Sequence, residues 1–449
     1  MSTFSFQGRN PLCRGLYPSR RDVVRAGAFG LLGSFVPSAV AAPKHSAKSV
    51  ILLFMWGGPS HIDTWDPKPD AAAEIRGEFR AIQTSVPGLR ITEHFPRLAA
   101  RAGKYTIVRS MTHTDAAHLS PVHHLLTGRL AAKTNSDADG PSRADSPCLG
   151  AIVEKVARGA GPMPTAVTLP WIVSHPAAPG GVAPGQNAGW LGMGFDPFLV
   201  TGDPNAPGFQ VAGLKVAADS STGRIAERAN LLRALESAKS PNDGFADLRS
   251  QAFDLLSSPA VAASFDLSRE PVSIRDQYGR HTHGQSCLLA RRLVEAGARM
   301  VTVNWPNDNQ NFWDTHQNNF PSLKDRLMPP ADQGFAALLD DLDARGMLRD
   351  TLVVWVGEFG RTPRVGTGGR EHWPHCYSAV LAGGGVRGGA VHGASDKTGA
   401  YPTNNPVSPA DLTATIYHAL GIDPQTTIVD RLGRVLALTE GKPLRALWG

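Results

Sequence analysis

Short apolar runs along the chain alternate with segments whose apolar positions recur at helical spacing. Five runs are apolar enough to form buried strands, at residues 49–55, 105–111, 299–305, 351–356 and 377–381. Helices are expected among them, for example at residues 282–296, 323–342 and 409–420. Buried strands that alternate with helices are typical of parallel sheets, so the pattern predicts an α/β protein with a mostly parallel central sheet.

Two long segments depart from this alternation. Residues 170–207 are dense in Pro and Gly without a clear period, and we expect them to form a long ordered loop or a lid. Residues 225–238 and 243–257 have helical patterns with polar outer faces, which indicates a helical insertion at about 222–258. The rest of residues 49–449 is expected to be one α/β domain.

The N-terminal region has the features of an export signal. Arg20 and Arg21 form a twin-arginine pattern, an apolar stretch follows at residues 26–36, and residues 39–41 offer an Ala-Val-Ala cleavage site. The alternative is an amphipathic N-terminal helix. We therefore expect residues 1–41 to be a signal peptide, followed by a linker at residues 42–48. The mature protein is expected to be exported already folded, to the periplasm or beyond, without a membrane span.

Composition changes this picture only slightly. Residues 1–41 hold five Arg and one Asp, so their removal lowers the net charge of the 449-residue chain from +6 to +2. The positive net charge of the full chain is thus weak evidence for nucleic-acid binding, and no nucleic-acid partner is expected. Cys148, Cys287 and Cys376 remain after cleavage, an odd and scattered set that indicates neither a disulfide framework nor a cysteine metal site.

The segment 351–375 is the strongest candidate for chemistry. Its apolar strand is followed by a loop rich in Gly and Pro that carries six polar residues, Glu358, Arg361, Arg370, Glu371, His372 and His375. Ligands in open α/β sheets bind beyond the carboxyl ends of the strands, which is where this loop lies. The alternative is a solvated connection with one capping carboxylate.

Three other strand exits carry potential metal ligands. His61 and Asp63 follow the first strand, His113 and His118 follow the second, and Asp314 and His316 follow the strand at 299–305. His61 and Asp63 have a plainer explanation as part of a turn, and Asp314 and His316 as part of a polar loop. Because the carboxyl ends of parallel strands share one edge, we expect these residues to converge.

Two Ser-Pro pairs predict helix starts, with Ser120 and Ser408 as N-caps and Pro121 and Pro409 at the first helical position. A hydroxyl at a helix N-terminus lies in a field that stabilises an alkoxide or a bound anion. Ser120 is therefore either a nucleophile or only a cap.

Carboxylates and imidazoles without Cys suit one or two divalent ions of the zinc, calcium or manganese class. Such an ion would activate water or a hydroxyl and offset charge on a phosphate or sulfate. Arg361 or Arg370 could bind the oxygens of that anion.

Several of these segments resemble the alkaline phosphatase/sulfatase superfamily, and in particular an uncharacterised family within it whose members carry twin-arginine signals. Ser120-Pro121 with the LLTGR run at 125–129 is similar to the sulfatase nucleophile helix, and residues 351–360 are similar to the strand that ends in two metal ligands. Glu371-His372-Trp373 is similar to the next metal-binding His, and residues 409–412 resemble a late helix. Gly57 and Gly58 stand where an Asp is expected, and Glu358 and Phe359 replace an Asp-His pair.

The resemblance implies an alkaline-phosphatase-like sandwich, with helices on both faces of the sheet. It also implies a metal-dependent hydrolase of phosphate or sulfate esters, with a small molecule or glycan ester as substrate. Ser120 or a metal-activated water would be the nucleophile, with Arg361 at the anion. The expected metal ligands are Asp314, His316, Glu358 and His372, completed by His118, His113, His61 or Asp63. The alternative is a non-catalytic exported protein that binds a sulfated or phosphorylated glycan or a protein.

Overall fold

The computed structural model of the protein describes residues 47–176, 178–214, 222–237, 246–306 and 312–448. The predicted signal peptide at residues 1–41 and most of the predicted linker lie outside the described residues. The described residues all belong to one compact unit, Ala42–Gly449.

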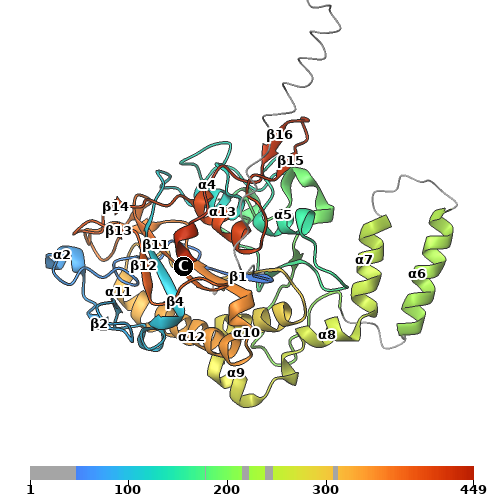
Figure 1. Ribbon diagram of the computed structural model, residues 1–449, viewed down its shortest axis with the longest axis horizontal. Coiled ribbons are helices and arrows are strands. Elements are labelled where there is room, and N and C mark those ends of the chain that lie inside the picture. The colour runs from blue at the N-terminus through green and yellow to red at the C-terminus, as the bar shows by residue number, and fades with distance from the viewer. Residues whose placement is uncertain (1–46, 177, 215–221, 238–245, 307–311, 449) are drawn as a thin grey trace, which may run out of the picture. The chain divides into compact units, whose positions relative to one another are not determined.

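An eight-stranded sheet runs through the centre of this unit (Figure 1). The strand order is β12-β4-β11-β8-β1-β7-β5-β6, and neighbours are parallel except at β11, which is antiparallel to both β4 and β8. Its strands are β1 (Ser49–Phe54), β4 (Tyr105–Met111), β5 (Ala166–Leu169), β6 (Phe198–Leu199), β7 (Met300–Asn304), β8 (Thr351–Val356), β11 (Tyr377–Gly383) and β12 (Ala390–His392). The predicted mostly parallel sheet is confirmed.

The central strands β1 and β8 are buried along their whole length, as continuous apolar runs predict for a sheet covered on both faces. Their register pairs Leu52 with Val354 and Phe54 with Val356, so both strands end together. Because β4, β1, β7 and β8 all run in the same direction, the loops that follow them lie at one edge of the sheet. Because β11 is antiparallel, its first residue, Tyr377, lies at that same edge, opposite Met111 at the end of β4.

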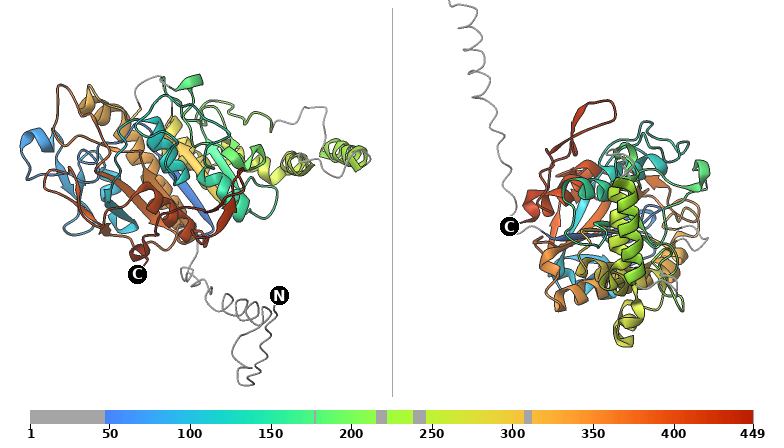
Figure 2. Two further views of the ribbon diagram at one scale, coloured as in Figure 1. Left: turned by 90° about the horizontal axis from the view of Figure 1, so that it is seen from above. Right: turned by 90° about the vertical axis from the view of Figure 1, so that its right-hand side faces the viewer.

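Helices cover both faces of the sheet, with α4, α5 and α13 on one side and α10 and α12 on the other (Figures 1 and 2). The helices are α2 (Ala73–Arg76), α3 (Pro96–Ala99), α4 (Leu119–Thr127), α5 (Leu149–Val156), α6 (Thr222–Ser237), α7 (Ala246–Ser257), α8 (Pro259–Phe265), α9 (Val272–Tyr278), α10 (Thr282–Glu295), α11 (Asn319–Pro321), α12 (Met328–Ala344) and α13 (Pro409–Ala419). None of the described helices combines the length and apolar character needed to cross a membrane.

The two predicted Ser-Pro caps have different outcomes. Ser408 caps α13 through a reciprocal capping box with Asp411, as predicted. The cap prediction for Ser120 is wrong, because α4 begins at Leu119 and Ser120 lies inside its first turn. Asp137, from the following loop, accepts hydrogen bonds from the amides of His118 and Leu119, both at 2.8 Å.

Within the described part of the chain, four two-stranded ribbons lie outside the main sheet. They pair β2 (Ala81–Gln83) with β3 (Arg90–Thr92), β9 (Gly360–Arg361) with β10 (His372–Trp373), β13 (Ala394–Ser395) with β14 (Pro402–Asn404), and β15 (Thr427–Val429) with β16 (Val435–Ala437). The β9–β10 ribbon follows β8 and leads into β11, so it lies at the sheet edge where the strand exits meet. Its register places His372 opposite Arg361.

Candidate metal centre

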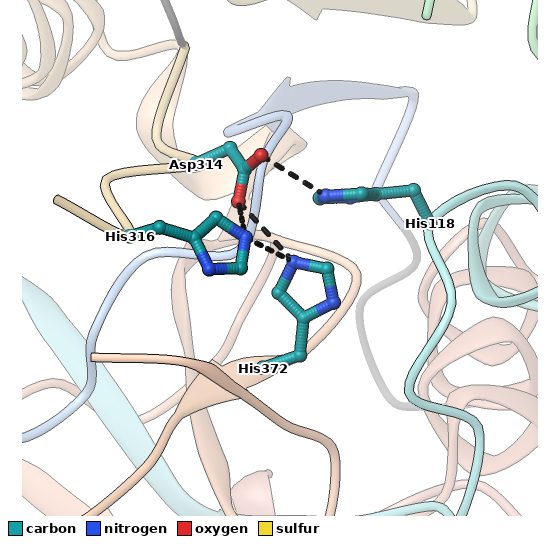
Figure 3. A group of neighbouring side chains, drawn as sticks. All are labelled: His118, Asp314, His316 and His372. Carbon is teal, nitrogen blue, oxygen red and sulfur yellow. Dashed lines mark hydrogen bonds and ion pairs between the residues drawn. The ribbon is translucent and has the colours of Figure 1, made fainter. Parts of the chain in front are cut away.

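Four side chains converge at this edge of the sheet, His118, Asp314, His316 and His372 (Figure 3). One ligand atom from each lies within 4.8 Å of the others. His118 comes from the end of the loop between β4 and α4, Asp314 and His316 from the segment after β7, and His372 from β10. Three separate parts of the chain therefore build one group, as the shared edge of parallel strands predicts.

Asp314 lies at the centre of the group. Its Oδ1 is 2.8 Å from Nε2 of His316 and 3.2 Å from Nε2 of His372, and its Oδ2 is 3.3 Å from Nε2 of His118. The side chain of His118 is only 4% exposed, whereas those of Asp314 and His316 are 22% and 32% exposed. The group is thus buried on the His118 side and open to a ligand on the His316 side.

Each imidazole is oriented by an oxygen acceptor on its other nitrogen. Nδ1 of His118 is 2.9 Å from Oε1 of Glu358, and Nδ1 of His372 is 2.7 Å from the carbonyl oxygen of Ala116. Nδ1 of His316 contacts the carboxylate of Glu371. A carbonyl or carboxylate oxygen only accepts, so each Nδ1 carries the proton and donates. In a neutral ring this leaves the Nε2 lone pair directed into the group, as in metal-binding histidines.

The charges of the group follow from this arrangement. Although burial alone would lower it, hydrogen bonds to Asp314 and Glu358 raise the pKa of His118 to about 9. The hydrogen bond to Asp314 also raises the pKa of His316, whereas burial lowers that of His372. Burial would raise the pKa of Asp314, but the three imidazoles and Arg361 hold it well below its ordinary value. The carboxylate of Asp314 therefore stays ionised, and it favours a proton on the imidazoles of His118 and His316.

Arg361 supports the carboxylate from behind. Its guanidinium is fully buried, its Nη2 is 2.5 Å from Oδ1 of Asp314, and it also donates to the carbonyl oxygens of Gly57 and Gly58. These partners lie within the protein, so the structure places Arg361 as a support for Asp314 rather than as an exposed anion clamp.

Glu358 lies one layer behind the group. Its two carboxylate oxygens accept the amide N–H of Gly57 at 3.0 and 3.1 Å, and Oε1 also faces His118. Gly57 has φ +107°, and a Cβ at this position would lie 2.4 Å from the backbone nitrogen of Asp314. A glycine is thus required in the turn after β1, where the backbone passes both Glu358 and Asp314.

The remaining predicted ligands lie outside the group of four. Nε2 of His113 is 2.7 Å from the carbonyl oxygen of Glu358, so His113 positions the backbone of that residue. His61 contacts the carbonyl oxygen of Gly399, and burial lowers its pKa to about 4. Asp63 forms a fully buried ion pair with Arg370, with an Nε–Oδ2 distance of 2.8 Å. The carboxylate of Asp63 and the guanidinium of Arg370 therefore stabilise the fold around the group.

Ser120 lies two residues beyond His118 and is buried. Its Oγ accepts the amide N–H of Ser136 at 3.2 Å. The loop that supplies Ser136 also supplies Asp137, which caps α4. The first turn of α4 is therefore covered by this loop.

Some contributors had no clear signal in the sequence. Glu371 and the Ala116 carbonyl orient two of the imidazoles, yet neither role follows from residue type or spacing. His175 lies in the Pro/Gly-rich segment 170–207, and its ring centroid is 5.0 Å from that of His118. The phenyl ring of Phe359 packs 4.5 Å from the ring of His372 and 5.0 Å from that of His118. Segment 170–207 thus reaches the candidate metal centre.

Comparisons with known proteins give the following matches. Among solved structures, the protein is similar to Ps i-CgsB (TM-score 0.41, 11% identity, covering 85% of this chain and 73% of the other). It is also similar to the PsFucS1 sulfatase from Pseudoalteromonas sp. (0.38, 13%, 85% and 68%) and to a protein in the alkaline phosphatase superfamily from Vibrio parahaemolyticus (0.38, 9%, 84% and 69%). No curated protein matches the chain.

The family comparison covers nearly all of the described protein. Residues 47–448 match the family described as "Protein of unknown function (DUF1501)". The chain therefore belongs to the DUF1501 family.

Proposed function

We propose that this protein is a metal-dependent hydrolase of phosphate or sulfate esters. The observation that carries the proposal is the group of three imidazoles and one carboxylate. Each imidazole has an oxygen acceptor at Nδ1, which directs its Nε2 into the group. The sequence motifs that resemble the alkaline phosphatase/sulfatase superfamily support the same reaction class.

The donor set suits a divalent ion of the zinc or manganese class. Three imidazole nitrogens and one carboxylate oxygen match the ligands of such ions, whereas calcium takes oxygen ligands almost entirely. A divalent ion held by His118, Asp314, His316 and His372 would supply Lewis acidity toward an ester oxygen. We assign one ion to this group.

The chain supplies the remaining roles. Glu358 and Glu371 accept hydrogen bonds from Nδ1 of His118 and His316 and so fix the proton on that nitrogen. Arg361 offsets the charge of Asp314. Ser120 is the candidate nucleophile, because the amide of Ser136 and the N-terminus of α4 would stabilise its alkoxide. A water molecule remains the alternative nucleophile.

One observation favours a second function. Phe359 stands where the resemblance implies a metal-binding His, and its ring packs against His118 and His372. A centre with fewer ligands than the superfamily pattern is compatible with a non-catalytic protein that binds a sulfated or phosphorylated glycan. For either function we propose export through the twin-arginine route, on the basis of Arg20 and Arg21.

The test combines metal analysis with a substrate screen. The purified protein is assayed for bound metals and then, metal-loaded and metal-free, against aryl phosphates and aryl sulfates. The hydrolase proposal expects about one tightly bound divalent ion per chain and turnover that a chelator abolishes. Loss of turnover in Ser120→Ala with retained metal would identify the serine as nucleophile. Bound metal without turnover, together with binding of a sulfated glycan, would replace the hydrolase with the binding function.

A further inference from the structure

The hairpin of β15 and β16 stands out at the top of the view in Figure 1. Its strands pair Thr427 with Ala437 and Val429 with Val435. Ile428 is 7% exposed and Leu438 is 1% exposed, so the base of the hairpin packs into the protein. The hairpin is therefore anchored at its base, and the segment from Val429 to Val435 forms its tip.

The tip exposes three aliphatic side chains. Val429 is 61% exposed, and Leu432 and Val435 are each 67% exposed. Val429 and Val435 are directly opposite each other in the register, so their side chains lie on the same face of the ribbon. Leu432 lies in the turn between them. Three exposed aliphatic side chains are thus gathered within the seven residues from Val429 to Val435.

The turn that carries Leu432 is held by hydrogen bonds. The carboxylate of Asp430 accepts the amide N–H of Leu432 at 2.8 Å and that of Arg434 at 2.9 Å, and it accepts Nε of Arg434 at 2.7 Å. The amide of Gly433 also donates to the carbonyl oxygen of Asp430. The exposed leucine is thus presented by an ordered turn, which lowers the entropic cost of binding.

The charge on the tip is positive. Arg431 is exposed and has no ion-pair partner among the residues that the structure describes. The charge of Arg434 is offset by Asp430. One uncompensated cation therefore lies beside the three aliphatic side chains, a combination that matches the interface of a membrane with anionic headgroups.

We propose that the hairpin tip docks on an anionic lipid surface. A stable protein partner usually needs about 20 to 30 residues on each side, and the tip offers seven from Val429 to Val435. An aliphatic tip with a neighbouring arginine instead suits shallow insertion, with the side chains of Leu432 and the two valines among the acyl chains and Arg431 at the phosphates. The inference is independent of the proposed hydrolase function.

The test is vesicle co-sedimentation with phosphatidylglycerol/phosphatidylcholine vesicles and with phosphatidylcholine alone. The full chain and the compact unit Ala42–Gly449 are both used, because residues 1–41 contain an apolar stretch that can itself bind lipid. We expect binding to the anionic vesicles that weakens as salt is added. The double variant Leu432→Ser/Val435→Ser and the variant Arg431→Glu should each lower the affinity roughly tenfold.

The matched control is Val272→Ser, which removes a valine that is 68% exposed at the start of α9. It should bind vesicles like the unmodified protein. Equal binding by the tip variants and the unmodified compact unit would overturn the proposal, as would failure of the unmodified unit to bind either vesicle. A concentration-dependent dimer that the tip variants abolish, without vesicle binding, would replace the lipid surface with a second copy of the chain.

Discussion

The Nε2 atoms of His316 and His372 lie 2.8 Å apart, and both face Oδ1 of Asp314. The Nδ1 atom of each ring already donates to an oxygen, so two neutral rings would direct their lone pairs at each other and at the carboxylate. This arrangement is stable only with a positive charge between the rings. A proton on His316, whose pKa the hydrogen bond to Asp314 raises, supplies that charge, and a divalent ion bound at the group would supply it in place of the proton.

Removing one imidazole should therefore remove the metal. We expect His372→Ala to lower the bound metal from about one ion per chain to a small fraction of that value. Elemental analysis after dialysis measures this, and near-UV circular dichroism checks that the variant is folded. His392→Ala is the matched control, because His392 lies on β12 outside the group of four. An unchanged metal content in a folded His372→Ala protein would remove His372 from the site.

A substitution of Glu358 tests whether this residue acts through His118 or binds the metal directly. Glu358→Gln keeps an acceptor for Nδ1 of His118 and for the amide of Gly57 but removes the charge. Outer partners of this kind typically change metal affinity about 10- to 100-fold, so we expect a loss in that range, measured by competition with a chelator of known affinity. A complete loss of metal would instead make Glu358 a direct ligand.

The metal-free protein should lose stability as the pH rises. Since the pKa of His118 is raised from 6.5 to about 9, its protonated form stabilises the fold fully below pH 6.5, and this contribution is lost as the pH rises through 9. The shift corresponds to about 3 kcal/mol. Urea unfolding in a chelator at pH 6 and pH 9.5 measures it, with His118→Gln as the reference. Parallel pH dependences of the two proteins would contradict this assignment.

Metal affinity should have the opposite pH dependence. A proton on Nε2 of His118 or His316 competes with the ion, because both pKa values are raised. We expect the apparent dissociation constant of the metal to fall as the pH increases from 6 to 9. Titration of the metal-free protein at several pH values checks this, and an affinity independent of pH would indicate that these two imidazoles are not ligands.

The buried pair of Asp63 and Arg370 should matter for stability and not for metal binding. Asp63→Asn leaves the guanidinium buried without its counter-charge, which typically costs about 3–5 kcal/mol. Asp139→Asn, in an exposed pair with Lys133, should cost less than about 1 kcal/mol. Denaturant unfolding compares the two variants. If Asp63→Asn lost metal while keeping its stability, Asp63 would belong to the centre.

Much of the fold followed from the sequence. The runs at residues 49–55 and 351–356 predicted buried strands because every residue after Ser49 and Thr351 is apolar, and both strands are central in the sheet. The Ser408 cap depends on residues that are neighbours in the sequence, so it was predictable as well. The cap at Ser120 was not, because Asp137, a residue 17 positions away, supplied the capping oxygen.

The sequence also predicted the edge of the sheet at which the candidate site lies. It did not predict which residues form that site. Eight candidate ligands were predicted at strand exits, and only the tertiary structure separated Asp314, His316, His372 and His118 from His61, Asp63, His113 and Glu358. Spacing along a loop does not determine where its side chains point. The antiparallel direction of β11 brings His372 to this edge, and the contacts of Asp63 with Arg370 and of Glu358 with Gly57 depend on residues about 300 positions apart. Long-range packing therefore decided which side chains form the candidate metal centre and which support it.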